Sequence, residues 1–359
     1  MPRWNATRSA SGRPDWACDV IPDLVTVGGL TVDNVVAADG TVALDQAGGN
    51  GAYSAVGALA WVARVGLVSC AVSTYPPDVL KRLRAGGVDL AGVAWSEQAL
   101  SAGSWFLYDG DGRRDEGLTA PGDALAEAGF PTDRLTPAQT AEWRAVLQAR
   151  RALGEIGYSE FRERHPLRAA QVPESWRAVK GVHLAPSAPS VVAEMLDLFS
   201  RDGTTITADP GWQLAEAGLD AIGPILSRLD AFLPSEVELR ALVPGAHPAD
   251  AIAVLAGRCP GAVAVKMGPE GALVWDRASR APVTVPVHHV ETRDPTGAGD
   301  SFSGGFLAGL VETGDPVQAA RFGAISAARV VSSFGAAGAL PADRDATRAA
   351  LHKDCNPCH

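Results

Sequence analysis

The stretch DPTGAGDSFSGGFLAGL, residues 294–310, joins a glycine-rich turn to an apolar segment with helical spacing. Phe302, Phe306 and Leu310 recur every four residues, as they would on one face of an α-helix. We therefore predict a helix that packs this face against a core and carries glycines and an aspartate at its first turn. A helix built only for packing would not need glycine at its start.

The first turn of this predicted helix combines an anion-binding geometry with a carboxylate. Gly297 and Gly299 lie where amide N–H groups lack acceptors within the helix and the helix dipole is positive, so this end favours a phosphate. Asp300 places a negative charge beside that anion, which suits a base that accepts the proton of a hydroxyl attacking a phosphoryl group. In the alternative interpretation, Asp300 caps the helix and the glycines serve close packing.

Short β-branched runs alternate with helical segments along the chain. The predicted strands cover residues 24–29, 66–73, 181–186, 204–210, 231–235 and 262–268. Their alternation with helices, such as those predicted over 50–65 and 214–229, is typical of a parallel sheet covered on both faces. Ligands of such sheets bind beyond the carboxyl ends of the strands, where Asp209, Ser235 and Gly268 are expected.

Two kinds of segment interrupt this alternation. Residues 31–46 and 92–114 are strand-like with internal Asp-Gly turns, so we predict antiparallel hairpins that form a lid. Residues 119–178 are predicted to be a helical insertion, and 131–180 has nine Lys+Arg against six Asp+Glu. This positive excess indicates either a solvated helical surface or a segment that grips an anionic substrate.

Composition excludes some classes of function. The chain has 31 Lys+Arg and 41 Asp+Glu, a formal charge of −10, which argues against a nucleic-acid-binding surface because phosphate backbones require a basic footprint. No run of about 18 apolar residues predicts a membrane span, and the N-terminus lacks the apolar core of a signal peptide. The five cysteines form no framework spacing, so a cytoplasmic protein with reduced thiols is predicted.

The stretch 294–310 resembles the second signature of the ribokinase (PfkB) family of carbohydrate and nucleoside kinases, with Pro295 where threonine is commonest. GGNGAYSAVGALAWVARVG, residues 48–66, resembles the family's first signature. The resemblance extends from about residue 23 to 342 and leaves out much of 119–178. It implies an α/β fold, a ribokinase-like three-layer sandwich with a mostly parallel central sheet and a small antiparallel β lid.

This resemblance also implies a domain organisation. The kinase domain is expected over residues 20–345, with lid segments at about 29–47 and 92–118. The helical insertion is expected at about 119–178, and residues 1–19 and 346–359 are expected to be mobile tails.

Several site residues follow from the resemblance alone. It implies that Asp300 is the catalytic base and that the backbone of 297–300, which includes Gly297, Ala298 and Gly299, is the anion hole. Residues implied to bind the acceptor are Asp33, which would hydrogen-bond its hydroxyls, and the turn residues Gly48, Gly49 and Asn50. A hairpin-turn role for Asp33 is the alternative interpretation.

The resemblance further implies ATP and Mg²⁺ as cofactors. Residues implied to lie beside the nucleotide are Lys266, Gly268 and Gly271. Glu238 is implied to hold water bound to Mg²⁺, although Ser235 stands where the family has asparagine and Glu238 also fits a first-turn helix acid. Asp294 and Thr296 match positions that bind a monovalent cation in some members, which leaves K⁺ activation open.

The favoured hypothesis is an ATP-dependent kinase that phosphorylates a hydroxyl of a sugar or sugar-like molecule. A nucleoside acceptor is the nearest alternative, and a non-catalytic protein that senses a sugar or nucleotide on the same fold is the second. The loop AVSTYPPD, residues 71–78, departs from the family pattern near the acceptor. Arg113 and Arg114 fit either an acceptor phosphate or the protection of a strand edge. A homodimer is also expected, because open lid edges often pair.

Overall fold

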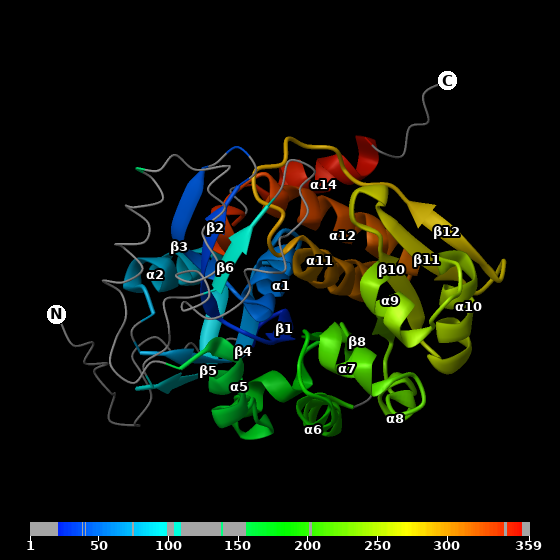
Figure 1. The fold of residues 1–359 in the computed structure, drawn as a ribbon, viewed down its shortest axis with the longest axis horizontal. Helices are drawn as coiled ribbons and strands as arrows, with labels where there is room; N and C mark the ends of the chain where they lie inside the picture. Colours follow the sequence, from blue (N-terminus) through cyan, green and yellow to red (C-terminus); the bar gives the residue numbers. More distant parts are fainter. Residues whose placement is uncertain are drawn as a thin grey trace.

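A computed structural model describes residues 21–37, 39, 41–73, 75–98, 104–108, 138, 156–200, 203–340 and 343–353 (Figure 1). Within these residues, nine strands form one sheet in the order β12-β11-β10-β9-β8-β7-β1-β4-β5. The strands that run parallel are β1 (Leu24–Val27), β4 (Val65–Val72), β5 (Val88–Ser96), β7 (Gly181–Leu184), β8 (Thr205–Ala208), β9 (Ala231–Phe232) and β10 (Ala262–Lys266). This arrangement confirms the predicted parallel sheet.

An antiparallel hairpin closes one edge of the sheet. Its strands are β11 (Ala272–Asp276), which pairs with β10, and β12 (Ala281–Val285). The tight turn between β10 and β11 leaves no room for a crossover helix, and a parallel pair would need one.

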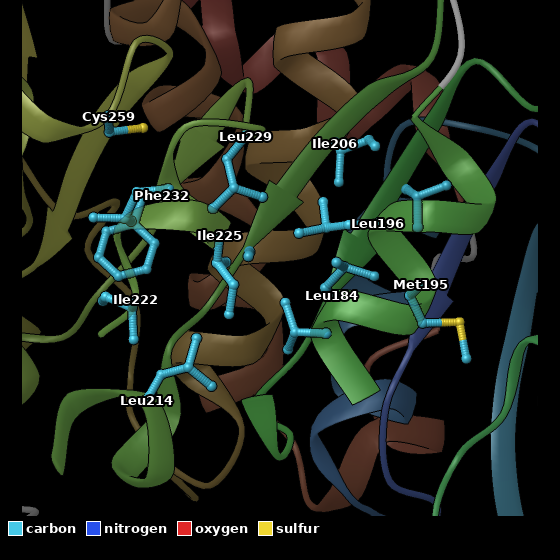
Figure 2. Packing of buried hydrophobic residues seen from close by; sticks show 14 of the residues in the cluster. Leu184, Met195, Leu196, Ile206, Leu214, Ile222, Ile225, Leu229, Phe232 and Cys259 are labelled. Atoms are coloured by element: carbon cyan, nitrogen blue, oxygen red, sulfur yellow. The ribbon is translucent and has the colours of Figure 1, made fainter. Parts of the chain in front are cut away.

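Helices cover both faces of the sheet. Successive residues of a strand point to opposite sides, so a strand whose residues are all apolar needs helices on both faces to bury them. Val25 and Val27 pack into a cluster with one group of helices: α6 (Pro189–Phe199), α7 (Gly211–Ala217), α8 (Gly223–Leu226), α9 (Glu236–Leu242) and α10 (Pro248–Arg258). Figure 2 shows this cluster, in which Leu184 and Ile206 of the strands lie near Met195 and Leu196 of α6. The sheet is therefore the middle of three layers.

The opposite face is covered by a second group of helices. Its members are α1 (Asn50–Leu59), α2 (Pro77–Gly86), α11 (Ala298–Thr313), α12 (Pro316–Val331) and α13 (Gly335–Gly338). Leu24 packs on this face, whereas its neighbour Val25 packs on the other. Both stretches quoted for the family resemblance thus form neighbouring helices, α1 and α11, on one side of the sheet (Figure 1).

A small second sheet has the strand order β3-β2-β6. β2 (Thr31–Val36) pairs antiparallel with β3 (Val42–Gly48), as predicted, but parallel with β6 (Ser104–Leu107). The predicted hairpin over 92–114 is wrong, because β5 is an edge strand of the central sheet that pairs parallel with β4. Its apolar residues are buried against helices on that sheet, and only β6 crosses to the small sheet.

The described residues shortly before β7 form short helices. These are α5 (Tyr158–Arg164) and the 3₁₀ turns η2 (Ala169–Gln171) and η3 (Glu174–Ala178). The structure does not describe Arg113, Arg114, the remainder of the second lid segment or, apart from residue 138, the part of the predicted helical insertion before residue 156.

The chain continues beyond the domain end predicted at residue 345. α14 (Arg344–Lys353) begins after Asp343, whose side chain accepts hydrogen bonds from the amides of residues 345 and 346. Arg348 forms an ion pair with Glu312 of α11, so residues 346–353 belong to the folded domain and the expected tail boundary is wrong here. Among the described helices, none has the length and apolar character needed to cross a membrane.

Candidate active site

Gly297 and Gly299 at the start of α11 lie in different environments. Gly297 is the N-cap residue with a φ of 76°, and a Cβ there would overlap the ring of Tyr53. A Cβ on Gly299 would instead lie 3.6 Å from Lys266 Cδ, an ordinary contact. Backbone conformation and packing therefore explain Gly297, whereas neither explains Gly299.

Two backbone amides at the start of α11 already donate hydrogen bonds. The Ala298 amide donates to the Pro295 carbonyl at 3.2 Å, and the Ser301 amide donates to the Gly297 carbonyl at 2.9 Å. Gly299 and Asp300 lie between them, where first-turn N–H groups have no acceptor within an α-helix. Asp300 is the acidic residue of this turn and is partly buried.

Glycines further along α11 have a packing role. A Cβ on Gly304 would overlap the Ser54 carbonyl oxygen of α1, and one on Gly305 would overlap the Ser326 hydroxyl of α12. Such close approach fixes α11 between α1 and α12. The first turn is thereby held at the carboxyl end of the central strands.

Lys266 at the end of β10 forms a buried ion pair with Asp209, which follows β8. Burial alone would lower the pKa of Lys266, but the carboxylates of Asp209, Glu238 and Asp300 raise it above its ordinary value. The ammonium group therefore stays protonated beside Gly299. Asp209 was expected only at a strand end, and its pairing with Lys266 was not foreseen.

Ser235 and Glu238 cap the N-terminus of α9. The Glu238 carboxylate accepts the Ser235 amide proton at 2.6 Å, and the Ser235 hydroxyl accepts that of Glu238 at 3.4 Å. This reciprocal pair is a capping box, so a structural role accounts for both residues. The Glu238 carboxylate also lies close enough to Lys266 to raise its pKa.

Asp33 lies in β2 rather than in a hairpin turn. Its carboxylate accepts a hydrogen bond from the Thr31 hydroxyl at 2.8 Å, and a Cβ on Gly48 would overlap it. Burial raises the pKa of Asp33 to about 7, the Thr31 hydrogen bond opposes this shift, and the charge of Asp294 adds to it. Gly48 is therefore the residue that leaves room for this carboxylate.

Asn50 joins three segments at the carboxyl edge of the sheet. Its side chain accepts the Gly29 amide proton at 2.5 Å and donates to the Pro186 carbonyl at 2.9 Å. Gly49, the N-cap of α1, has a φ of 93°, a conformation that favours glycine. These contacts place the predicted acceptor residues Gly48, Gly49 and Asn50 on one turn close to Asp33.

Asp294 and Thr296 precede α11. The Asp294 carboxylate accepts the Thr296 amide proton at 2.9 Å, and the Thr296 hydroxyl bonds the hydroxyl of Tyr108 at 2.7 Å. Burial raises the pKa of Asp294. Tyr108, which follows β6, and Tyr53 were missed by sequence reasoning because no local pattern marks a side chain that reaches a distant loop.

The predicted nucleotide glycines lie on the turn between β10 and β11. Gly268 has a φ of 59° and open space around it, whereas a Cβ on Gly271 would overlap the Val285 carbonyl oxygen. The turn is closed by a hydrogen bond from the Met267 amide to the Gly271 carbonyl at 2.8 Å. Because Lys266 immediately precedes it, this turn lies beside the first turn of α11.

Residues 162–343 match the family model for the pfkB family carbohydrate kinase. The chain belongs to the PfkB family. It is therefore a kinase of the ribokinase type, and the predicted family and fold are confirmed.

The names of relatives of this PfkB kinase refer to different phosphoryl acceptors. A cytidine kinase of Thermococcus kodakarensis is 26% identical over 317 residues, which cover 87% of this chain and 97% of the relative. An ATP-dependent ribose-1-phosphate kinase of Halopiger xanaduensis is 28% identical over 337 residues, covering 90% and 91%.

Solved structures share the fold of the PfkB kinase. A nucleoside kinase of Burkholderia thailandensis in complex with inosine has a TM-score of 0.66 and 18% identity, covering 92% of this chain and 98% of that one. An E. coli protein in complex with ATP and Mg²⁺ has a TM-score of 0.62 and 20% identity, covering 93% and 100%. Across the described residues, no group of three or more His, Cys, Asp or Glu side chains is placed to hold a metal ion.

Proposed function

We propose that this PfkB kinase transfers the γ-phosphoryl group of ATP to a hydroxyl of a sugar or nucleoside at the first turn of α11. Asp300 takes the proton of the acceptor hydroxyl as its oxygen bonds to the γ-phosphorus, the bond from phosphorus to the bridging β,γ-oxygen breaks, and ADP leaves. The observation that carries the proposal is the juxtaposition of Asp300 with Gly299, whose missing Cβ no packing contact explains.

The backbone of residues 297–300 is the proposed anion hole. Ala298 already donates its amide to Pro295, so the Gly299 amide is the principal donor of the proposed hole. Donors fixed before the reaction stabilise charge on the transferring group at no cost in reorganisation. Gly297 contributes by turning the chain into the helix.

Asp33 and Asn50 hold the acceptor in the proposed site, with Gly48 and Gly49 providing the turn. Asp33 accepts hydrogen bonds from acceptor hydroxyls, and its pKa of about 7 lets it be ionised under slightly alkaline conditions. The small sheet of β2, β3 and β6 is the proposed lid, which would exclude water during transfer.

The nucleotide is proposed to lie against the β10–β11 turn. Lys266 places its charge near the transferring phosphates, and Gly268 and Gly271 keep the turn close to the nucleotide. Mg²⁺ would neutralise charge on these phosphates when bound, with Glu238 holding its water. Asp294 and Thr296 are proposed ligands of a monovalent cation. The homodimer and the cytoplasmic location stay predictions.

Replacement of Asp300 tests the proposed chemistry. ADP release is measured with Mg²⁺ and ATP across sugars, sugar phosphates and nucleosides. Asp300→Asn should lower kcat for the best acceptor about 1000-fold, the range of a lost general base, while ATP still raises Tm. Glu312→Gln, which changes an exposed carboxylate at the other end of α11, is the matched control and should keep full activity.

An acceptor that raises the wild-type Tm without stimulating ADP release would contradict the proposal. That result would favour the alternative, a protein that senses its ligand on a kinase fold.

A further inference from the structure

A cavity of about 400 Å³ lies between α5, the first turn of α6 and the loop after β1. Its lining includes Gly28, Gly29, Arg162, His165, Ser187 and Ser190. The reaction proposed above uses none of these residues. The cavity nevertheless adjoins the carboxyl edge of the sheet, where ligands of parallel sheets bind.

One wall of the cavity is the N-terminus of α6. No side chain caps this helix, and its first turn contains no acidic residue. Ser187, just before the helix, is only 6% exposed, and its hydroxyl makes no hydrogen bond within the described part of the chain. A positive helix end and a largely buried serine that has no hydrogen-bond partner among the described residues thus line the same cavity, which favours an anion.

Arg162 of α5 supplies the charge that such a ligand requires. Its guanidinium donates to the Pro186 carbonyl at 3.2 Å and lies 5.9 Å from the centre of the Tyr158 ring. Among the described residues, no carboxylate pairs with it. A guanidinium offers several donors in a fork that matches phosphate and carboxylate oxygens, and most of them stay available here.

The carboxylates that line the cavity do not cancel this charge. Glu194 of α6 already bonds Arg168 at 3.3 Å and the Ala169 amide at 2.7 Å. Glu163 is exposed at the rim. His165, the remaining basic residue of the lining, bonds the Ser96 hydroxyl at 3.3 Å.

The cavity is linked to the proposed acceptor site through one carbonyl group. Asn50 and Arg162 both donate to the Pro186 oxygen, so their nitrogen atoms are separated by no more than two hydrogen-bond lengths. Tyr158 lies between the two sites, with its hydroxyl near Gly29. Burial is the main cause of the raised pKa of Tyr158, Arg162 opposes it, and the charges of Asp33 and Asp300 add to it.

We propose that this cavity binds an anionic group, a phosphate or a carboxylate, carried by the phosphoryl acceptor. The substrate is then a sugar phosphate or a sugar acid, held by Arg162, Ser187 and the Ser190 amide while its free hydroxyl faces Asp300. This inference rests on the proposed function, because it concerns the acceptor of that reaction.

Acceptor specificity tests the inference. The full chain is assayed with ATP and Mg²⁺ against ribose-1-phosphate, gluconate and ribose, with cytidine as a nucleoside. An anionic acceptor should exceed ribose in kcat/KM by at least about tenfold, the effect of a charge-assisted hydrogen bond. Activity with ribose-1-phosphate indicates a phosphate, and activity with gluconate indicates a carboxylate. Equal or better activity with ribose or cytidine overturns the proposal.

Variants separate a role of Arg162 from a general loss of structure. Arg162→Gln should raise KM for the anionic acceptor and lower its kcat/KM at least about tenfold more than that of ribose. Ser187→Ala should act in the same direction, about threefold. The matched control is Arg164→Gln on the same helix, because Arg164 pairs with Glu160 outside the cavity and should leave acceptor preference unchanged. Equal losses with both acceptors in Arg162→Gln overturn the proposal.

Binding distinguishes failure of this inference from failure of the proposed function. If no acceptor is turned over, the Tm of the protein is measured with ribose-1-phosphate and with gluconate. A rise in wild type and Arg164→Gln that is absent in Arg162→Gln supports the anion site even though the kinase proposal has failed. No rise with either compound overturns the inference.

Discussion

Gly299 and Gly297 of α11 should respond differently to the same added methyl group. Gly299→Ala has room for its Cβ, so we expect unchanged or slightly higher stability, by up to about 1 kcal/mol from helix propensity. We expect its kcat/KM to fall at least about tenfold, because the methyl group would keep the phosphate from the backbone donors. Urea unfolding and ADP release measure the two effects.

Gly297→Ala provides the contrast. It must adopt a φ of 76° and displace the Tyr53 ring, so we expect destabilisation of about 3 kcal/mol. Equal losses of stability in the two variants would show that Gly299 also serves packing and would contradict its proposed role.

The buried carboxylate of Asp33 should make stability depend on pH. Because its folded pKa of about 7 lies above the ordinary 3.8, the folded state keeps a proton that the unfolded chain loses between pH 4 and 7. The contribution of this group to the free energy of unfolding therefore falls as pH rises through that window. Asp33→Asn does not titrate, so its stability relative to wild type should grow by about 2–4 kcal/mol from pH 4 to 8.

Urea unfolding at several pH values measures this difference. Asp78→Asn, an exposed aspartate of α2, is the control and should show no comparable growth. The Asp33→Asn variant should also lose acceptor binding. A stability difference that does not change with pH would contradict the assignment of a raised pKa.

Among single residues, the sequence predicted the positions that depend only on neighbouring residues in the chain. The positions of Asp300 and Gly299 follow from helix periodicity and from the geometry of a helix N-terminus. The Asp209–Lys266 pair and the contact of Tyr53 with Gly297 could not be predicted, because each joins segments far apart in the chain. Such contacts depend on strand order, which periodicity does not encode.

Among the elements, the packing of α11 against α1 gives a sharp test. Gly304→Ala would force a methyl group into the Ser54 carbonyl, so we expect a loss of about 2–4 kcal/mol in the free energy of unfolding. Gly257→Ala, in the last turn of α10 with open space around it, is the control and should leave the free energy of unfolding unchanged or raise it by up to about 1 kcal/mol. Urea denaturation of both variants measures the difference, and similar values would contradict the packing argument.

The predicted strands and the helices that begin at residues 50 and 298 were confirmed, because buried β-branched runs and helical spacing are local signals. The single helix predicted over 214–229 is wrong: α7 ends at Ala217, and α8 begins only at Gly223, because Gly218 with a φ of 82° ends the first helix. The predicted lid shows that local sequence patterns do not determine which strands pair. β2 and β3 were predicted as a hairpin through their Asp-Gly turn, whereas residues 92–96 of β5 were assigned to the lid although β5 joins the central sheet. The alternation of apolar and polar residues along one strand does not show which strand it pairs with. The partner depends on which helices, far away in the sequence, bury the strand's apolar side chains.

The arrangement of the whole molecule predicts how ligands change its motions. Asp33 lies in β2 and Asn50 follows β3 directly, so an acceptor that binds both should stabilise the small sheet. We expect the best acceptor to slow amide hydrogen exchange in β2 and β3 at least about tenfold, as local opening becomes costlier. ATP alone should slow exchange mainly in the β10–β11 turn. Equal protection of both regions by ATP alone would contradict this division.

α5 approaches the proposed acceptor site from a different part of the chain than α11, which carries Asp300 (Figure 1). Substitutions at Arg162 or Tyr158 can therefore change the proposed acceptor contacts while the helix that carries Asp300 stays the same.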